Sequence, residues 1–176
     1  MKASDKVTID GRNRIAIRRA RTGDAAELLR LIRAYYRFDK IRFHGTAIGQ
    51  ALARLLKNRR LGSVWIMRDG IKAVGYVVLA FNFDLEFGGF EGLVTDVYID
   101  EKYRGRGLGE RAIEVVDDYC RSQGIGTVEL QVVEDNEDAQ AFYRRVGFTR
   151  LNRIVMAREV GRRGGRGASA GRLEEK

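Results

Sequence analysis

Residues 104–109 form the loop that most constrains the fold of this chain. They read Arg-Gly-Arg-Gly-Leu-Gly and stand between a predicted strand and a predicted amphipathic helix. Three glycines let the backbone turn tightly and expose its N–H groups. The helix that follows adds unpaired N–H groups and the positive end of its dipole, and Arg104 and Arg106 add positive charge. The sequence therefore predicts a preformed site for a phosphate or pyrophosphate group.

Three kinds of phosphate-binding loop compete for this stretch, and a flexible basic loop without a ligand is the fourth interpretation. A P-loop needs a Lys-Ser or Lys-Thr pair after its glycine run, but Gly109 is followed by Glu110 and Arg111. A dinucleotide fingerprint fits better, because residues 107–112 match G-x-G-x-x-A and Glu129 follows at a distance suited to a ribose contact. The third kind is the pyrophosphate loop of acyl-CoA transferases.

The flanking residues decide among these alternatives. Residues 92–99 read as a strand, in which Leu93, Thr95, Val97 and Ile99 alternate with Val94, Asp96 and Tyr98. Apolar residues then recur at helical spacing from Leu108 to Cys120, and Gly124 and Gly126 end that helix. A strand over 127–133 and a short helix follow. A dinucleotide-binding domain carries its glycine loop in the first strand–helix turn, whereas this loop comes late in the chain.

The run from Leu93 to Phe148 resembles the GNAT acetyltransferase superfamily. Ile15 to Asp24 are similar to the family's first strand and helix cap, so the resemblance covers most of the chain. The motifs that carry it are Asp96-Val-Tyr-Ile99, Arg104-Gly-Arg-Gly-Leu-Gly109 and Asn136-x-x-Ala139-x-x-Phe-Tyr143-x-x-x-Gly147-Phe148.

The resemblance implies a mixed α/β fold, with a twisted central sheet of about six to seven strands and helices on both faces. The expected order is β-α-α-β-β-β-α-β-α-β. Strands are expected at 13–18, 63–68, 72–82, 92–99, 127–133 and 149–158, helices at 24–38 and 46–58, and a loop at 83–89. Residues 1–12 are expected to be a flexible basic N-terminus, 13–160 a single acetyltransferase domain, and 161–176 a disordered Gly/Arg tail with too few apolar residues to fold.

The family's chemistry implies that acetyl-CoA is the co-substrate and lies where two central strands separate. Backbone groups of Val97, Tyr98 and Ile99 would hold its pantetheine arm and thioester. Asn136 would contact it and cap the short helix. The remaining expected cofactor contacts are Arg104, Gly105, Arg106, Gly107, Leu108, Gly109, Glu110, Ala139 and Tyr143.

Two side chains are the candidates for proton transfer. Tyr143 would stand near the leaving sulfur as a general acid, because a phenol with a pKa near 10 suits a thiolate acceptor; the alternative is a core aromatic. Asp96 would take the amine proton through water, with Glu91 and Glu134 as runners-up. A positioned water alone is the remaining alternative.

The acetyl acceptor is the least constrained part of the prediction. The sequences of these motifs are similar to those of diamine acetyltransferases and of a broad group of bacterial family members. This similarity implies that the acceptor is a primary amine, either a small polyamine or a protein amine. Asp84, Glu86, Glu91 and Glu134 are the candidate acidic contacts for such an amine. A homodimer, a catalytically silent CoA-binding regulator and a nucleic-acid-associated module using the basic termini also stay open.

The length of 176 residues favours a chain with a single core. No apolar run approaches the roughly 20 residues of a membrane span and no signal peptide is visible, so a cytoplasmic protein without a membrane partner is expected. One cysteine, Cys120, and one histidine, His44, cannot build a usual zinc site, and no metal is expected. The net charge of +9 and the Arg-Gly tail predict at most a weak affinity for nucleic acid.

Overall fold

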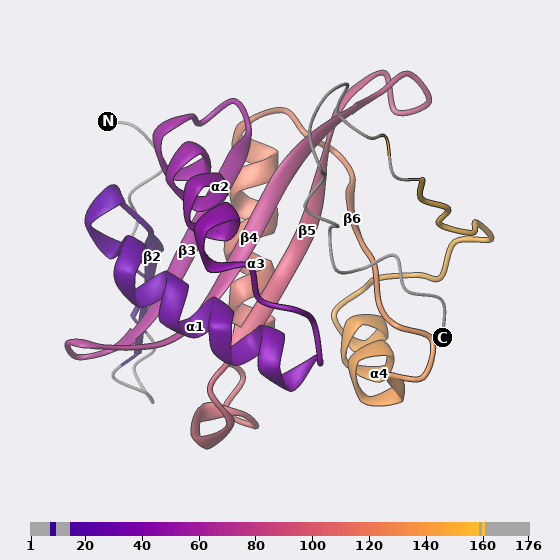
Figure 1. Ribbon diagram of the computed structural model, residues 1–176. Helices are drawn as coiled ribbons and strands as arrows, with labels where there is room; N and C mark the ends of the chain where they lie inside the picture. Colours follow the sequence, from indigo (N-terminus) through magenta and orange to yellow (C-terminus); the bar gives the residue numbers. More distant parts are fainter. Residues whose placement is uncertain (1–7, 10–14, 159, 161–176) are drawn as a thin grey trace.

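The framework of the protein is a six-stranded mixed sheet with helices on both faces (Figure 1). The computed structural model describes residues 8–9, 15–158 and 160. The strands lie side by side in sequence order, antiparallel from β1 to β5 and parallel between β5 and β6. They are β1 (Thr8–Ile9), β2 (Ile15–Arg19), β3 (Gly62–Asp69), β4 (Lys72–Asp84), β5 (Gly89–Ile99) and β6 (Val128–Leu130).

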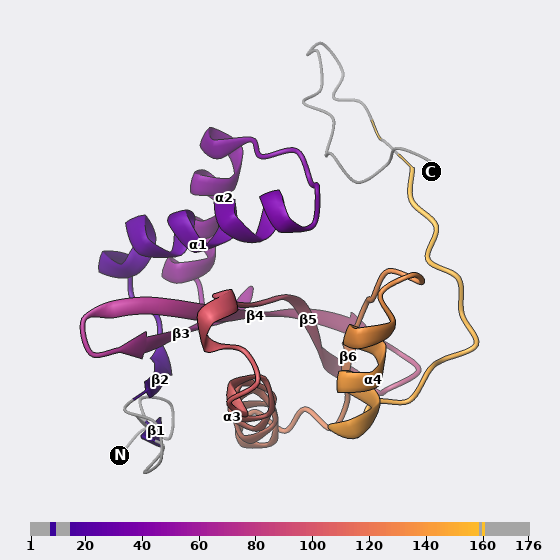
Figure 2. The same ribbon diagram turned by 90° about the horizontal axis from the view of Figure 1, so that it is seen from below.

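The helices form two layers around this sheet. Figure 2 shows α1 (Ala25–Phe38) and α2 (Gly45–Lys57) on one face, α3 (Leu108–Ser122) on the other, and α4 (Glu137–Arg145) beside β6. Short 3₁₀ turns, η1 (Thr22–Asp24) and η2 (Glu101–Tyr103), precede α1 and the glycine loop. The mixed α/β architecture predicted from the sequence is therefore confirmed.

Apolar side chains fill both interfaces between the sheet and the helices. Residues 73–79 of β4 are all buried, because β4 is central and helices cover both of its faces. One core cluster joins the sheet to α3 through residues such as Leu79, Val94 and Val116. The other joins it to α1 and α2 through residues such as Leu28, Ile66 and Tyr76. These two cores fix the position of β5, which carries the candidate site.

The predicted last strand at 149–158 is wrong, since those residues carry no strand. Ile154 and Met156 are 90% and 89% exposed. β6, the edge next to them, is only three residues long, and a short edge offers few backbone partners. At the other end, Thr8–Ile9 pairs with β2 inside the segment predicted to be flexible. The rest of the predicted N-terminal segment and the predicted tail at 161–176 lie outside the described residues.

The predicted loop at 83–89 is also mostly strand. β4 continues to Asp84 and β5 begins at Gly89, so only residues 85–88 turn. Phe83 and Phe90 lie opposite each other in this extension, and their rings meet edge to face at 5.1 Å between centroids. Cross-strand aromatic pairs stabilise such a hairpin, and the alternation of this short segment did not reveal the pair.

Asp24 precedes α1 as predicted, but its carboxylate does not cap that helix. It accepts two hydrogen bonds from Arg18, at 2.8 and 2.7 Å, one from Arg68 at 3.1 Å and one from the backbone N–H of Arg21 at 2.7 Å. Its side chain is buried. The hydrogen-bonded Arg18 guanidinium holds the pKa of Asp24 well below its usual range. The residue therefore ties the start of α1 to β2 and β3.

Candidate active site

A cleft opens where β5 and β6 separate. The two strands pair from Gly92 to Val94 against Val128 to Leu130, and after Leu130 the chain leaves the sheet. The cleft has a volume of about 880 Å³. Its walls come from β5, the glycine loop, the start of α3, residues 130–133, α4 and the end of α1.

A β-bulge at Thr95 marks the point of separation. Val94 pairs with Leu79 and Asp96 with Val78, so Thr95 has no counterpart on β4. The strict alternation predicted for residues 92–99 is therefore interrupted. Val94 and Val97 both pack on the α3 side, whereas Tyr98 packs on the α1 side. Beyond the bulge, the edge of β5 that faces the cleft has no strand partner among the described residues.

The glycine loop approaches the cleft with two residues in the left-handed region. Gly105 has φ 71° and Gly107, the N-cap of α3, has φ 76°. A Cβ built on either residue would meet no heavy atom within 4 Å. The loop therefore leaves open space beside the first, unpaired N–H groups of α3, where an anion is favoured.

The two arginines of the loop are held differently. Arg104 lines the cleft, donates through Nε to the Ile99 carbonyl at 3.0 Å and lies 4.7 Å from the centroid of the Phe38 ring. Arg106 donates to the Lys102 carbonyl at 2.9 Å, lies over Tyr103 and is not part of the cleft wall. Of the predicted cofactor contacts, Arg106 is the one that the structure does not bring to the cleft.

Close packing between α3 and α4 sets the width of the cleft. A Cβ on Gly109 would lie 2.8 Å from Cζ of Phe142, so only glycine allows this approach without a shift. Glu110 and Arg145 form an ion pair at 3.1 Å across the same junction. Asn136 caps α4, because its Oδ1 accepts a hydrogen bond from the Ala139 N–H at 3.0 Å.

Tyr143 projects from α4 into the cleft wall. Its ring contacts Phe142 and Phe148 edge to face, with centroids 5.0 and 5.6 Å away. Burial raises the pKa of Tyr143 to about 12. Asp96 lies on β5 in the same cleft, and its Oδ2 accepts a hydrogen bond from Thr95 Oγ1 at 2.9 Å.

The four acidic residues predicted to contact the acceptor lie outside the cleft wall. Glu91 is buried, 4% exposed, and accepts a hydrogen bond from Asn82. Glu86 pairs with Arg153 at 2.6 Å and Glu134 with Arg150 at 3.5 Å. Asp84 accepts from the Glu86 N–H. The structure therefore does not gather these residues into one acidic mouth.

The end of α1 supplies a wall that the sequence did not reveal. Tyr35, Phe38 and Asp39 line the cleft, and the Tyr35 ring lies 6.2 Å from that of Tyr98. Gln131 to Val133 and Arg145 were missed as well. The helical spacing of Leu28, Ile32 and Tyr35 placed Tyr35 on the inner face of α1, but nothing in that spacing indicates which strand it meets.

In the described part of the chain, no group of three or more His, Cys, Asp or Glu side chains is arranged to hold a metal ion. Within the same residues, no helix has both the length and the apolar character needed to cross a bilayer.

Comparisons with known proteins agree with this geometry. The family model described as the acetyltransferase (GNAT) family matches residues 26–148. No curated protein sequence matches the chain significantly.

Solved structures share the fold. An integron cassette protein from the Cole Harbour Salt Marsh metagenome is 29% identical with a TM-score of 0.75, covering 83% of this chain and 91% of that one. An aminoglycoside acetyltransferase from an uncultured soil sample is 18% identical with a TM-score of 0.68, covering 84% and 97%. A protein described as a predicted acetyltransferase from Clostridium acetobutylicum, solved with acetyl-CoA, is 16% identical with a TM-score of 0.72, covering 82% and 96%.

The matched family model spans the glycine loop, the bulged strand and the helix that carries Tyr143. Together with the observed fold, this match shows that the chain belongs to the GNAT acetyltransferase family and is an acyl-CoA N-acetyltransferase.

Proposed function

We propose that the protein transfers an acetyl group from acetyl-CoA to a primary amine by direct attack, with both substrates bound at once. The observation that carries this proposal is the cleft itself. It joins an unpaired strand edge, the N-terminus of a long helix and a half-buried tyrosine in one wall. Each part suits a different portion of a thioester substrate.

The cofactor fits the residues that are present. The open space beside Gly105 and Gly107 would take the pyrophosphate, held by the first N–H groups of α3. The unpaired edge of Val97 to Ile99 would hold the pantetheine arm as an added strand does. The Clostridium acetobutylicum neighbour was solved with acetyl-CoA, which supports this assignment. Acetyl-CoA supplies the activated acetyl group as a thioester.

Tyr143 would donate a hydrogen bond to the leaving sulfur while the carbon–sulfur bond breaks. Its raised pKa of about 12 keeps the hydroxyl protonated at neutral pH. Complete proton transfer to a thiolate, whose conjugate thiol has a pKa of about 8.5, is then uphill. We therefore assign Tyr143 to stabilisation of the developing negative charge, and the amine supplies the proton that the thiolate finally keeps.

Asp96 is the proposed acceptor of the proton that the ammonium group loses before attack, directly or through a water molecule; the proton that the thiolate keeps is the second one, which the nitrogen loses after attack. The competing carboxylates are less suited, because Glu91 is buried away from the cleft and Glu134 pairs with Arg150. Asp96 faces the α1 side of β5, beside Tyr98 and the cleft wall formed by Tyr35 and Asp39. We propose that the acceptor amine enters from this side.

The acceptor is proposed to be a cationic amine. The soil aminoglycoside acetyltransferase acts on an amine of that kind, and the carboxylates on the α1 side of the cleft here are Asp39 and Asp96. Together they favour an ammonium group at the entrance, which must lose a proton before it attacks the carbonyl carbon.

The test is a panel of polyamines, aminoglycosides and lysine peptides, assayed for CoA release and for a mass gain of one acetyl group. At least one amine should be acetylated by the wild type and much more slowly by the Tyr143→Phe variant. Tight acetyl-CoA binding by calorimetry, without turnover of any amine, would instead favour a silent CoA-binding regulator.

A further inference from the structure

The positive charge of the described chain is concentrated in one segment. Between residues 30 and 60 the sequence has nine basic side chains and one carboxylate, Asp39, which leaves +8 against a net +9 for all 176 residues. This segment contains most of α1, the connection to α2, α2 itself and the turn that follows. Its basic residues are Arg30, Arg33, Arg37, Lys40, Arg42, Arg54, Lys57, Arg59 and Arg60.

All nine side chains are exposed, and none forms an ion pair with a described carboxylate. Other arginines of the protein do have acidic partners. Arg121 pairs with Asp118, and Arg153 pairs with Glu86. Uncompensated charges of one sign repel one another and create a positive potential over the surface that carries them. A polyanion would neutralise that potential.

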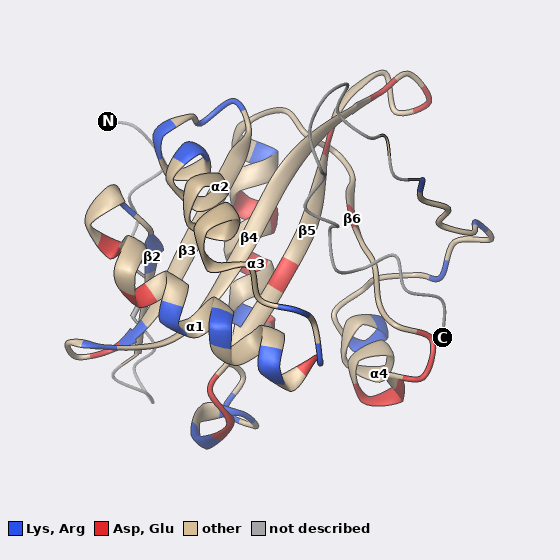
Figure 3. Cartoon of the chain, in the orientation of Figure 1, with Lys and Arg blue, Asp and Glu red and all other residues tan. Residues whose placement is uncertain are grey.

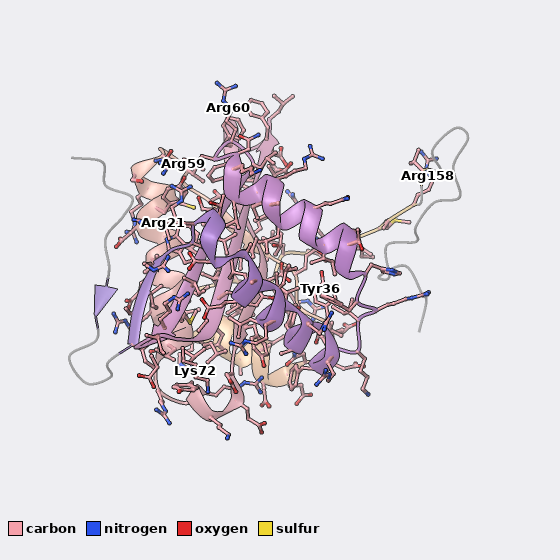
Figure 4. All side chains as sticks on the ribbon, turned by 60° about the vertical axis from the view of Figure 1, so that its left-hand side comes forward. Arg21, Tyr36, Arg59, Arg60, Lys72 and Arg158 are labelled. Atoms are coloured by element: carbon pink, nitrogen blue, oxygen red, sulfur yellow. The ribbon has the colours of Figure 1, made fainter. Side chains whose placement is uncertain are left out.

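These charges lie in two groups, one on α1 and the connection that follows it (residues 30–42) and one at the end of α2 (residues 54–60). Arg30, Arg33 and Arg37 have the spacing of one helical stripe on α1. Figure 3 shows blue segments along α1, the connection and the end of α2. In Figure 4, Arg60 extends outward past the end of α2. We call the nine residues the α1–α2 basic surface.

A recess between the two helices lies within this surface. It has a volume of about 350 Å³, and Phe43, Arg30 and Arg33 form part of its wall. The Arg33 guanidinium lies 4.8 Å from the centroid of the Phe43 ring. An aromatic ring and a guanidinium plane are the groups on which unpaired bases stack. A recessed ring is poorly placed for insertion into a lipid bilayer.

From this combination we propose that the α1–α2 basic surface binds single-stranded nucleic acid, for which RNA is the probe. The arginines and lysines contact successive phosphates, and one base enters the recess beside Phe43. The proposal is independent of the acetyl acceptor, because it concerns the outer side of α1 and α2 rather than the cleft. The end of α1 nevertheless lines the cleft through Tyr35 and Asp39, so bound RNA lies next to the acceptor entrance.

The test is fluorescence anisotropy of the full-length chain with a short single-stranded RNA over a series of salt concentrations. The test variant is the triple Arg33→Gln, Arg37→Gln, Arg42→Gln. The matched control is Lys72→Gln, Arg121→Gln, Arg150→Gln, which removes the same charge elsewhere. Each phosphate contact contributes about 0.7 to the slope of log affinity against log salt for single strands, so the test variant should lose about 2 in slope. The control should keep the wild-type slope and affinity.

Two further measurements separate stacking and location from charge. Phe43→Leu should weaken RNA binding but leave heparin binding unchanged, since heparin has no bases. Saturating CoA should leave RNA affinity unchanged. The proposal is overturned if the two triple variants bind alike, if Phe43→Leu weakens RNA and heparin equally or neither, if CoA competes with RNA, or if anionic phospholipid vesicles bind while RNA does not.

Discussion

Tyr143 is the residue whose proposed role can be tested with the smallest chemical change. Replacing it with phenylalanine removes the hydroxyl and keeps the ring that contacts Phe142 and Phe148. We expect kcat to fall by about 10²-fold, the scale for losing one donor to a developing anion, with little change in acetyl-CoA affinity. Steady-state CoA release measures both. Tyr119→Phe, on the buried face of α3 and outside the cleft wall, is the matched control. Equal turnover in Tyr143→Phe and wild type would mean that the Tyr143 ring serves packing alone.

The proposed role of Asp96 is tested by the pH dependence of the reaction, because a residue that accepts a proton changes that dependence. If its carboxylate takes the amine proton, the Asp96→Asn variant can use only amine molecules that are already neutral in solution. The variant's kcat/KM should then rise tenfold per pH unit up to the pKa of the free amine, while the wild type has a flatter profile over the same range. Profiles measured with one amine check this, with Asp118→Asn on the exposed side of α3 as control. Superimposable pH profiles of the wild type and Asp96→Asn would mean that a water molecule, and not Asp96, accepts the amine proton.

Residues in a contiguous motif were predictable, and residues brought together by packing were not. Gly107, Asn136 and Tyr143 stand in short motifs with a recognisable order, and all three line the cleft. Asp39 follows a helix in the first quarter of the chain and reaches the cleft only because α1 packs across β4 and β5. Glu91 was misplaced for the same reason, since spacing along a strand does not say what covers it.

The turn into α3 carries the clearest prediction for an element. Gly107→Ala places a methyl group in the open space of the loop, and Gly124→Ala, at φ 73° after the same helix, does so away from the cleft. Both variants should lose about 1–2 kcal/mol of stability from the left-handed backbone. Only Gly107→Ala should also lose acetyl-CoA affinity, by about tenfold or more, the scale of one charge-assisted hydrogen bond. Calorimetry and thermal melting separate the two effects, and equal affinities would contradict the pyrophosphate assignment.

The start of α1 should be sensitive to acid. The pKa of Asp24 is depressed in the folded protein by Arg18, so its contribution to stability is full above the unfolded pKa of about 4 and is lost as pH falls below it. Asp24→Asn should lower the free energy of unfolding by up to about 3 kcal/mol at pH 7, since it leaves the half-buried Arg18 and Arg68 without their carboxylate partner. Urea unfolding at pH 7 and pH 3 should show the difference from wild type shrinking at the lower pH. A constant difference would mean that packing, not charge, holds this junction.

Helices and strands were predictable where the periodic pattern of apolar residues fits only one kind of secondary structure. The apolar spacing of α3 and the buried run of β4 were enough to assign both. The bulge at Thr95 was not predictable, because a single inserted residue changes the side of every later side chain without changing composition. The strand predicted at 149–158 is absent for a reason that lies in the tertiary structure. A strand forms only against a partner edge, and β6 ends at Leu130.

At the scale of the whole molecule, charge is distributed unevenly along the chain. The segment 30–60 contributes +8, and residues 161–176 contribute +3 from five basic and two acidic side chains. The tail was the obvious candidate for nucleic-acid affinity in the sequence, because it combines arginine with glycine. The segment 30–60 was less obvious there, because its basic residues are interleaved with the apolar residues that pack α1 and α2 on the sheet.

Removal of the tail therefore separates two sources of polyanion affinity. A protein ending at Val160 should melt at the same temperature and acetylate amines at the same rate, because residues 161–176 have few apolar side chains with which to pack. Its RNA affinity should keep most of its dependence on salt, since the nine basic residues of α1 and α2 remain. Melting curves, turnover and salt titrations of the two proteins make the comparison. A large loss of stability or turnover would mean that the tail packs against the domain. A large drop in the slope of log RNA affinity against log salt concentration would mean that the tail, and not the α1–α2 basic surface, binds the RNA.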